Sequence, residues 1–291
     1  MNDERIGFTA AALLSRIRDK RPLIHNITNA VVANVTANAT TAVGAIPVMA
    51  FAPEEIADMV RQADALVLNM GTPTPQLIET MIVAGKTANE IGIPVVYDPV
   101  GAGSTPFRLS SASQILGTIR PSVIRGNPAE IASLIGRAAR IKGIEAQCVD
   151  MPREDLTMEA ASCLHTVVAV TGAKDCVSDG SRLFVIENGH PFMARIVGSG
   201  CVATSIIAPF CSVERDFALA AACALAYLGA SAQLAAPASN GPGTFQTRWL
   251  DAMANITSAG LAGLCAISLH NRGPEVGRSD SVGRPASRHE E

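Results

Sequence analysis

A turn of small residues, Gly198-Ser-Gly-Cys201, carries the clearest chemical signal in the sequence. Two glycines just before a predicted helix let the backbone approach a ligand closely. The unpaired N–H groups of the first helical turn and the helix dipole then favour an anion at that end. We therefore predict an anion hole at residues 198–201. For these four residues taken alone, a loop that merely changes the direction of the chain is an equal alternative.

Cys201 lies where this helix is expected to begin. N–H dipoles at a helix start favour a thiolate, so the position predicts a lowered thiol pKa and a candidate base. A buried core residue is the usual role of a cysteine, and nothing distinguishes the other six by position. The place of Cys201 in the chain, and not its residue type, makes it a candidate.

Three charged side chains close, or closely follow, short apolar runs that are predicted strands. Asp98 and Glu130 offer hard oxygen ligands, which suit a Mg²⁺ ion that is bound mainly through nucleotide phosphates. Arg125 is able to hold phosphate oxygens through two parallel hydrogen bonds. The alternatives are a turn at Asp98, a first-turn helix charge at Glu130 and a surface ion pair at Arg125.

Polar side chains also interrupt an apolar stretch near the N-terminus. The segment His25-Asn-Ile-Thr-Asn29 is followed by Asn34 and Asn38, which share one face if this region is helical. Burying such amides is costly unless they bond a ligand, a neighbouring chain or the backbone. We interpret the cluster as functional, against the alternative of solvated caps and turns.

Two other nucleotide-binding patterns fit the sequence poorly. Gly198-x-Gly200-x-x-Ala203 matches a loose dinucleotide fingerprint, but it comes late in the chain and lacks an acidic residue closing the next strand. Gly85-Lys-Thr87 resembles the end of a phosphate-binding P-loop, but Thr80 stands where the leading glycine belongs. Neither pattern is adopted.

The elements that must position these residues follow an α/β pattern. Four apolar runs rich in β-branched residues predict buried parallel strands, at residues 65–70, 93–97, 123–125 and 167–170. Segments such as 76–92 and 128–136 have the length of crossover helices. Ligands bind at the carboxyl ends of the strands in such sheets, so the polar residues should converge on one crevice.

Composition narrows the class of protein. The chain has 291 residues, 48% of them hydrophobic and 17% charged, which is enough apolar material for one large core. The net charge is −3, and the basic residues are scattered along the sequence and not clustered. We therefore expect neither nucleic acid nor a membrane as a partner. Seven cysteines without a CxxC pair, and an N-terminus without a signal-peptide pattern, indicate a cytoplasmic protein.

Composition also predicts the domain organisation. We expect a single domain over residues 1–270. The alanine-rich stretch 217–238 contains Gln233 and Pro237, so we predict a buried helix there and not a membrane span. Residues 271–291 contain almost no large apolar side chain and are predicted to form a disordered tail.

Taken together, several motifs closely resemble those of hydroxyethylthiazole kinase, of the ribokinase-like superfamily, from about residue 21 to residue 263. In chain order they are HNITN at residues 25–29, Pro47-Val-Met49, Tyr97-Asp-Pro-Val-Gly-Ala-Gly103, Ile124-Arg-Gly-Asn-Pro-Ala-Glu130, Val170-Thr-Gly-Ala-Lys-Asp175 with Asp179-Gly180, and Gly198-Ser-Gly-Cys201. The resemblance implies a three-layer ribokinase-like α/β fold, with a mostly parallel central sheet and helices on both faces. This sequence departs modestly from the family pattern at Ser199, where threonine is usual, and at Thr40-Thr41, which replaces a more apolar pair.

The resemblance also implies an activity. This is the ATP-dependent phosphorylation of the hydroxyl of 4-methyl-5-(2-hydroxyethyl)thiazole, in salvage towards thiamine. It places Cys201 where most members of the superfamily carry a catalytic aspartate, and Gly198 and Met49 beside the thiazole. Asn29 of the polar cluster is a further candidate contact to the substrate. Because transfer to the hydroxyl makes small demands on a base, we expect a Cys201 thiolate to suffice.

For the nucleotide and the metal, the resemblance implies that Arg125 and Thr171 bind ATP, with Gly200 leaving room for a phosphate. Asp98 and Glu130 are implied near Mg²⁺ and its waters. Family members are homotrimers with active sites between subunits, which would account for an asparagine-rich segment at an interface.

Two alternatives remain within the same fold. One is an ADP- or ATP-dependent NAD(P)H-hydrate dehydratase, which normally retains an aspartate at the position of Cys201. The other is a non-catalytic module that binds a thiazole, for which Asp98, Glu130 and Cys201 would be unnecessary.

Overall fold

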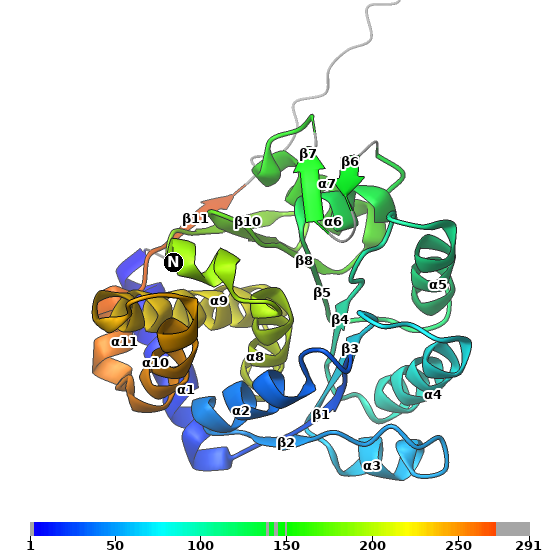
Figure 1. Cartoon of the computed structure of the whole chain (residues 1–291), viewed down its shortest axis with the longest axis horizontal. Helices are drawn as coiled ribbons and strands as arrows, with labels where there is room; N and C mark the ends of the chain where they lie inside the picture. Colours follow the sequence, from blue (N-terminus) through cyan, green and yellow to red (C-terminus); the bar gives the residue numbers. More distant parts are fainter. Residues whose placement is uncertain (1–2, 138–139, 143–144, 149, 272–291) are drawn as a thin grey trace, which may run out of the picture.

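One nine-stranded sheet runs through the middle of the molecule, between two layers of helices (Figure 1). The structure is a computed structural model, which describes residues 3–137, 140–142, 145–148 and 150–271. Across the sheet, the strands are β11 (Ile267–Asn271), β10 (Arg182–Ile186), β9 (Asp175–Ser178), β8 (Val167–Val170), β5 (Val123–Gly126), β4 (Val95–Asp98), β3 (Ala65–Asn69), β1 (Leu23–Ile27) and β2 (Ile46–Val48). A separate hairpin is formed by β6 (Arg140–Lys142) and β7 (Glu145–Cys148).

The sheet is parallel from β8 to β2 and antiparallel from β8 to β11. The four predicted strands are all present as β3, β4, β5 and β8. Strand β4 begins at Val95, later than predicted, and directly follows Pro94, a residue that has no N–H to donate to a neighbouring strand. The antiparallel part lengthens the sheet beyond what the apolar runs predicted.

Helices cover both faces of the sheet, which confirms the predicted fold class (Figure 1). One face carries α1 (Asp3–Lys20), α2 (Ala33–Val43), α8 (Ser199–Val213), α9 (Phe217–Ala235), α10 (Pro242–Asn255) and α11 (Ser258–Leu264). The other carries α3 (Ile56–Gln62), α4 (Pro75–Ile91), α5 (Pro106–Leu116), α6 (Pro128–Leu134) and α7 (Arg153–Leu164). Two short 3₁₀ helices are η1 (Pro191–Arg195) and η2 (Ala236–Ala238).

Two hydrophobic cores separate the three layers. Strand side chains alternate between them, as the period of two requires. In β3, for example, Ala65 and Val67 join the core under α8 and α9, whereas Leu66 and Leu68 join the core under α4. Full burial on both faces explains why these strands are continuous apolar runs.

The alanine-rich stretch forms α9 and then η2, in agreement with the predicted buried helix. Within the described residues, it is the one helix long and apolar enough to cross a membrane. Most of its side chains are buried against the sheet and α8, so it is a core helix.

Strand β11 reaches Asn271, so the predicted disordered tail begins with one residue that is ordered in the sheet. The rest of that tail, residues 272–291, lies outside the described part of the chain.

The order of the strands creates a crevice near β1. The chain passes from β1 through α2 to β2 on one side, and then through α3 to β3 on the other side of β1. Loops that leave β1 and β3 therefore diverge at the carboxyl edge of the sheet. Such a switch point is where parallel sheets commonly bind ligands.

Candidate active site

The carboxyl ends of five parallel strands bring polar side chains to one edge of the sheet. Asn29 follows β1, Asn69 closes β3, and Asp98 closes β4. Arg125 lies in β5, and Thr171 follows β8. Helix α8 begins at this edge, and its first turn contacts Arg125 and Asn29. The predicted convergence on one crevice is therefore present.

A chain of hydrogen bonds runs along this edge and ends on Asp98. The amide of Asn29 donates to Asn69 Oδ1 (2.8 Å), and the amide of Asn69 donates to Asp98 Oδ2 (2.9 Å). The same oxygen accepts from Thr204 Oγ1 on α8 (2.7 Å) and lies 3.4 Å from Nη1 of Arg125. Asp98 is fully buried, and its Oδ1 has no hydrogen-bond partner among the described residues.

Burial raises the pKa of Asp98, while the charge of Arg125 and the hydrogen bond from Thr204 oppose that shift. A buried carboxylate with one unpaired oxygen is costly unless a cation or a donor binds there. The edge is therefore built to receive a further positively charged or protic group.

Arg125 lies against the N-terminus of α8. Its guanidinium donates to Thr171 Oγ1, and a Cβ atom on Gly200 would lie 2.4 to 2.8 Å from guanidinium atoms. Only glycine lets the two approach this closely. A cation at the positive end of a helix dipole needs a counter-charge, which Asp98 supplies. An anion at this place would be attracted by both the guanidinium and the helix.

The helix start itself agrees with the sequence prediction. Gly198 is the N-cap of α8, with φ of 86°, and a Cβ there would lie 2.3 Å from a methyl group of Val32. A left-handed conformation and close packing both require glycine. The turn therefore opens a helix, and the residue that follows, Ser199, is its first member.

The expected thiolate at Cys201 is wrong. Burial raises the pKa of the Cys201 thiol to about 11, and the charge of Asp98 adds to that shift. The charge of Arg125 and the hydrogen bonds from the amides of Asn69 and Asn29 oppose it without cancelling it. Cys201 is therefore a thiol at neutral pH, because loss of water outweighs the helix dipole on which the prediction relied.

Glu130 joins two of the loops at this edge. Its Oε1 accepts from the N–H of Gly101 (2.7 Å) and its Oε2 from the N–H of Asn127 (2.8 Å), which completes a capping box at the start of α6. Burial, followed by the charge of Asp98, raises the pKa of Glu130 to about 7. Glu130 thus lies in the first turn of α6, as the alternative raised from its sequence had it, and in addition caps that helix beside the charged cluster.

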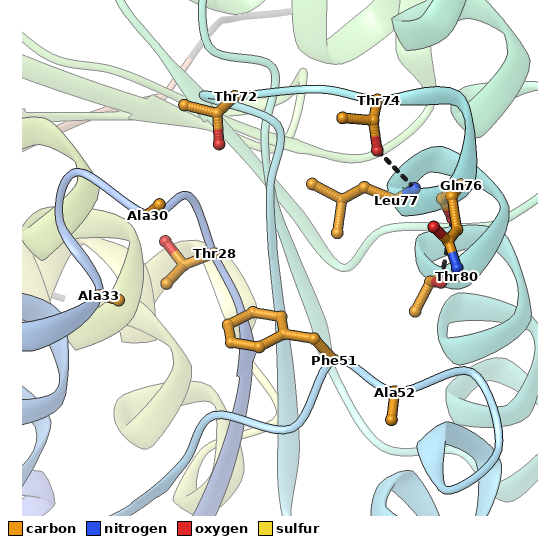
Figure 2. Close-up of a pocket in the computed structure, with 10 residues that line it drawn as sticks. All are labelled: Thr28, Ala30, Ala33, Phe51, Ala52, Thr72, Thr74, Gln76, Leu77 and Thr80. Carbon is orange, nitrogen blue, oxygen red and sulfur yellow. Dashed lines mark hydrogen bonds between the residues drawn. The ribbon is translucent and has the colours of Figure 1, made fainter.

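A pocket of about 620 Å³ opens beside this cluster, between the loops that follow β1, β2 and β3 (Figure 2). We call it the edge pocket. Its wall is mostly small, apolar or hydroxyl side chains around one aromatic ring: Thr28, Ala30, Ala33, Phe51, Ala52, Thr72, Thr74, Gln76, Leu77 and Thr80. A planar, weakly polar molecule suits such a lining.

Met49 lies in the loop that supplies Phe51 to the edge pocket, but it is not itself among the lining residues. The loop is held to β1 by a hydrogen bond between His25 Nε2 and the Ala50 carbonyl (3.0 Å). His25 belongs to the polar cluster that was predicted to be functional. In the structure its hydrogen bond holds a loop of the pocket, which is a structural role.

Asn34 and Asn38 are not brought to the site. They lie exposed on α2, as the sequence spacing predicted for one helix face, and Asn38 donates to Asn34 (3.1 Å). Nearby, Val31 and Val197 are 67% and 77% exposed and line a groove of about 450 Å³ together with Asn34.

Sequence reasoning missed three residues that organise the site. Asn69 is a polar residue at the end of an apolar run, a signal that the strand pattern already contained. Thr204 lies one turn after Cys201 on α8, so its spacing was a weaker signal. Arg108 on α5, described below, gave no signal in the sequence.

Comparisons with known proteins agree on one family. Residues 14–259 match the model of the hydroxyethylthiazole kinase family. The chain is 50% identical to hydroxyethylthiazole kinase of Moorella thermoacetica over 256 residues, which are 88% of this chain and 96% of that protein. It is also 50% identical to the kinase of Chloroflexus aggregans over 252 residues, which are 85% of this chain and 89% of that one.

Solved structures give the same result. The hydroxyethylthiazole kinase protein of Pyrococcus horikoshii OT3 superimposes with a TM-score of 0.82 at 38% identity, over 90% of this chain and 99% of that one. An ADP/ATP-dependent NAD(P)H-hydrate dehydratase of Bacillus subtilis, crystallised with ATP and Mg²⁺, has a TM-score of 0.57 at 15% identity, over 81% of this chain and 92% of that one. At that identity the second likeness indicates a shared fold alone.

Proposed function

Because this chain belongs to the hydroxyethylthiazole kinase family, it is an enzyme that phosphorylates the hydroxyl of a thiazole alcohol, and we propose that the carboxyl edge of its sheet is the active site. The substrate is 4-methyl-5-(2-hydroxyethyl)thiazole, in thiamine salvage. The observation that carries the proposal is the position of Arg125, directly over Gly200 at the start of α8 and beside Asp98.

ATP is the proposed phosphoryl donor. Its terminal phosphates would bind at the first turn of α8, where Gly200 leaves space, with Arg125 and Thr171 as side-chain partners. The positive helix end and the guanidinium supply the charge complementarity that such a site needs. Arg125 bonds Asp98 and Thr171 in the structure, so phosphate binding would exchange some of these bonds for new ones.

The residues fit a Mg²⁺ ion held mainly by the nucleotide. Asp98 would hold it through its unpartnered Oδ1, and Glu130 would lie close to its waters. The described residues contain no group of three or more His, Cys, Asp or Glu that could hold a metal ion. Bound there, the ion would neutralise charge on the phosphates.

The thiazole ring is proposed to occupy the edge pocket, with Met49 and Gly198 close to it. Asn29 follows Thr28, which lines that pocket, and the Asn29 amide donates to the sulfur of Cys201 (3.8 Å). The hydroxyethyl arm would extend along Asn29 towards Cys201. As a thiol, Cys201 would orient the hydroxyl and would not act as a charged base.

With these placements, phosphoryl transfer depends mainly on how the hydroxyl and the terminal phosphate are positioned relative to each other. The hydroxyl oxygen attacks the terminal phosphoryl group in line through a loose transition state, in which the nucleophile needs little activation. The bond between that phosphorus and the bridging oxygen breaks, ADP leaves, and the proton of the hydroxyl is released to solvent. Arg125 and the amides of residues 199–201 would stabilise charge on the transferred group. Asn69 and Thr204 would hold Asp98 in place, since both donate to its Oδ2.

We further propose that the chain through Asn271, one residue beyond the boundary expected from the sequence, forms one catalytic domain in a cytoplasmic homotrimer. The support is the exposed pair Val31 and Val197, which lies beside Asn29 and Gly198 of the site. Apolar side chains this exposed next to an active site fit burial by a neighbouring subunit.

An assay with the thiazole alcohol, ATP and Mg²⁺, with product mass as the readout, tests the function. We expect a product heavier by one phosphoryl group and stoichiometric ADP. Binding of the alcohol without any phosphorylated product would indicate the non-catalytic module. Dehydration of NAD(P)H hydrate in place of phosphorylation would indicate the lyase of the same fold.

A further inference from the structure

Arg108 joins two loops of the proposed active site from behind. Its Nη1 donates to the carbonyl oxygens of Val100 (2.7 Å) and Met70 (3.1 Å), and its Nη2 donates to that of Gly71 (2.8 Å). The side chain comes from the first turn of α5 and is half-buried. One guanidinium therefore holds the loop after β3 and the loop after β4 together.

The partners of Arg108 are unusual for a charged side chain. Within the described residues it has no carboxylate at ion-pair distance, and all three bonds go to backbone carbonyls. A planar guanidinium presents several donors in a fixed fork, which matches carbonyls from two separate loops. Lysine, a single point charge, cannot reproduce that arrangement.

The first of these loops carries one wall of the edge pocket. The N–H of Gly71 donates to Asn69 Oδ1 (3.0 Å), and a Cβ on Gly71 would lie 2.4 Å from the amide nitrogen of Asn29. Thr72 and Thr74, which line the pocket, follow directly. A shift of Gly71 would therefore move both the pocket wall and the hydrogen-bond chain that leads to Asp98.

The second loop carries the charged part of the site. Val100 lies two residues after Asp98, and the N–H of the next residue, Gly101, donates to Glu130. Arg108 thus sets the position of the pocket wall relative to Asp98 and Glu130. The pocket wall and the charged residues must be aligned with each other for the substrate hydroxyl to reach the phosphoryl group.

We propose that Arg108 is a positioning residue that fixes the distance between the thiazole ring and the phosphoryl-transfer site. The inference rests on the proposed placement of the ring in the edge pocket. Because misplacement of about 1 Å costs about 100-fold in rate, loss of the fork should lower kcat more than it weakens binding of either substrate.

The chain offers a matched control. Arg18 on α1 also donates to three backbone carbonyls, those of Ile256 (2.7 Å), Ala254 (3.1 Å) and Met253 (3.3 Å), but it lies in an element that contributes nothing to the site. Arg18→Met removes the same kind of fork elsewhere. It therefore reports the purely structural cost of losing three such bonds.

The test compares Arg108→Met, Arg108→Lys, Arg18→Met and Arg18→Lys in kcat, in KM for both substrates, and in Tm. We expect Arg108→Met to lower kcat by about 10- to 100-fold, with each KM changed less than about threefold, and Arg108→Lys to lie between it and the wild type. The Arg18 variants should lower Tm by a similar amount and keep kcat. Equal kcat losses at Arg18 and Arg108, or an unchanged kcat in Arg108→Met, would overturn the proposal.

A separate variant tests the proposed position of the thiazole ring, so that an error in that position can be told apart from an error in the role of Arg108. Phe51→Ala removes the aromatic ring of the edge pocket and should raise KM for the thiazole alcohol by at least about tenfold, with little effect on KM for ATP. An unchanged thiazole KM would overturn the ring placement, and this inference with it. A raised thiazole KM together with normal kcat in the Arg108 variants would overturn the inference alone.

Discussion

Burial, and not residue type or chain position, decides the chemistry of single residues at this site. Cys201 lies in the first turn of α8, where the dipole favours a thiolate by about 0.3 to 2 kcal/mol. Each unit of pKa corresponds to about 1.4 kcal/mol, so a rise from the usual 9.0 to about 11 opposes and exceeds that effect. The sulfur therefore acts through its position and weak hydrogen bonding.

Replacement of Cys201 tests this role. Cys201→Ala should lower kcat by about 10- to 100-fold while KM for ATP changes less than about threefold, because the sulfur is hydrogen-bonded by Asn29, on the proposed path of the hydroxyethyl arm. Between pH 6 and 9, the pH dependence of kcat should have the same shape in the wild type and in Cys201→Ala, because the thiol does not ionise in this range. A Cys-dependent ionisation near pH 7, or full turnover in the variant, would contradict the thiol role.

Glu130 supplies a prediction about pH and stability. Its pKa is raised from 4.5 to about 7 in the folded chain, so the folded state holds a proton that the unfolded state has lost between these values. The contribution of this group to stability is therefore full below about pH 4.5 and is lost as the pH rises through about 7, at no more than about 1.4 kcal/mol per pH unit.

Glu130→Gln removes that ionisation. The free energy of unfolding of the variant, relative to the wild type, should increase as the pH rises from about 5 to about 8, measured by denaturant unfolding at each pH. The loss of one capping hydrogen bond lowers stability equally at every pH, so the slope and not the offset is diagnostic. A constant difference across this range would show that the carboxyl group is already ionised at pH 5.

At the scale of elements, α8 matters because it connects the glycine turn to the sheet. Thr204 donates from the second turn of this helix to Asp98 at the end of β4 (2.7 Å), and Ser205 donates to Asn26 in β1 (3.1 Å). Both hydroxyls are buried in a mostly apolar helix. These two bonds fix the rotation of α8, and hence the direction of its first-turn amides.

Thr204→Val keeps the shape of the side chain and removes its donor. We expect a loss of about 1 to 3 kcal/mol in the free energy of unfolding, because the buried carboxylate of Asp98 loses one of its hydrogen bonds. Activity should fall as well, since Asp98 and α8 lose the hydrogen bond that connects them directly. Thr204→Ser, measured in the same unfolding and turnover experiments, should restore most of both; a valine variant as stable as the wild type would argue against this link.

For the whole molecule, the topology places the site at a surface that includes exposed apolar residues. Loops from β1, β2 and β3 diverge at the switch point and form the edge pocket, while Val31 and Val197 remain exposed beside it. A site formed by one chain alone would leave these side chains in water. The proposed homotrimer would cover them and would close the site with a second chain.

Light scattering coupled to gel filtration tests the assembly. The wild type should have about three times the 30.2 kDa mass of one chain. The double variant Val31→Asp and Val197→Asp should have a lower mass and a folded circular dichroism spectrum, because charges cannot be buried unpaired in an interface. Phe8→Asp is the control. Phe8 is also apolar and exposed, but it lies on α1, outside the loops that carry Val31 and Val197, so this variant should keep the wild-type mass. A wild-type mass equal to one chain would contradict the trimer.

The sequence by itself determined the local features. Apolar runs specified β3, β4, β5 and β8, because a strand buried on both faces must be continuously apolar. The glycine turn indicated the start of α8, because glycine tolerates the backbone conformations that a tight turn before a helix requires. Ordered motifs identified the family, and parallel topology then implied that Asp98, Arg125 and Thr171 would meet at one edge.

Only the tertiary structure decided how these groups behave together. The pKa of Cys201 depends on how much water its neighbours exclude, and the role of Arg108 depends on carbonyls of residues 70, 71 and 100. Residues distant in the chain, such as Thr204 and Asp98, make contacts that no local pattern encodes. Desolvation and hydrogen bonding act through space, so they follow from the packed fold and not from the order of residues.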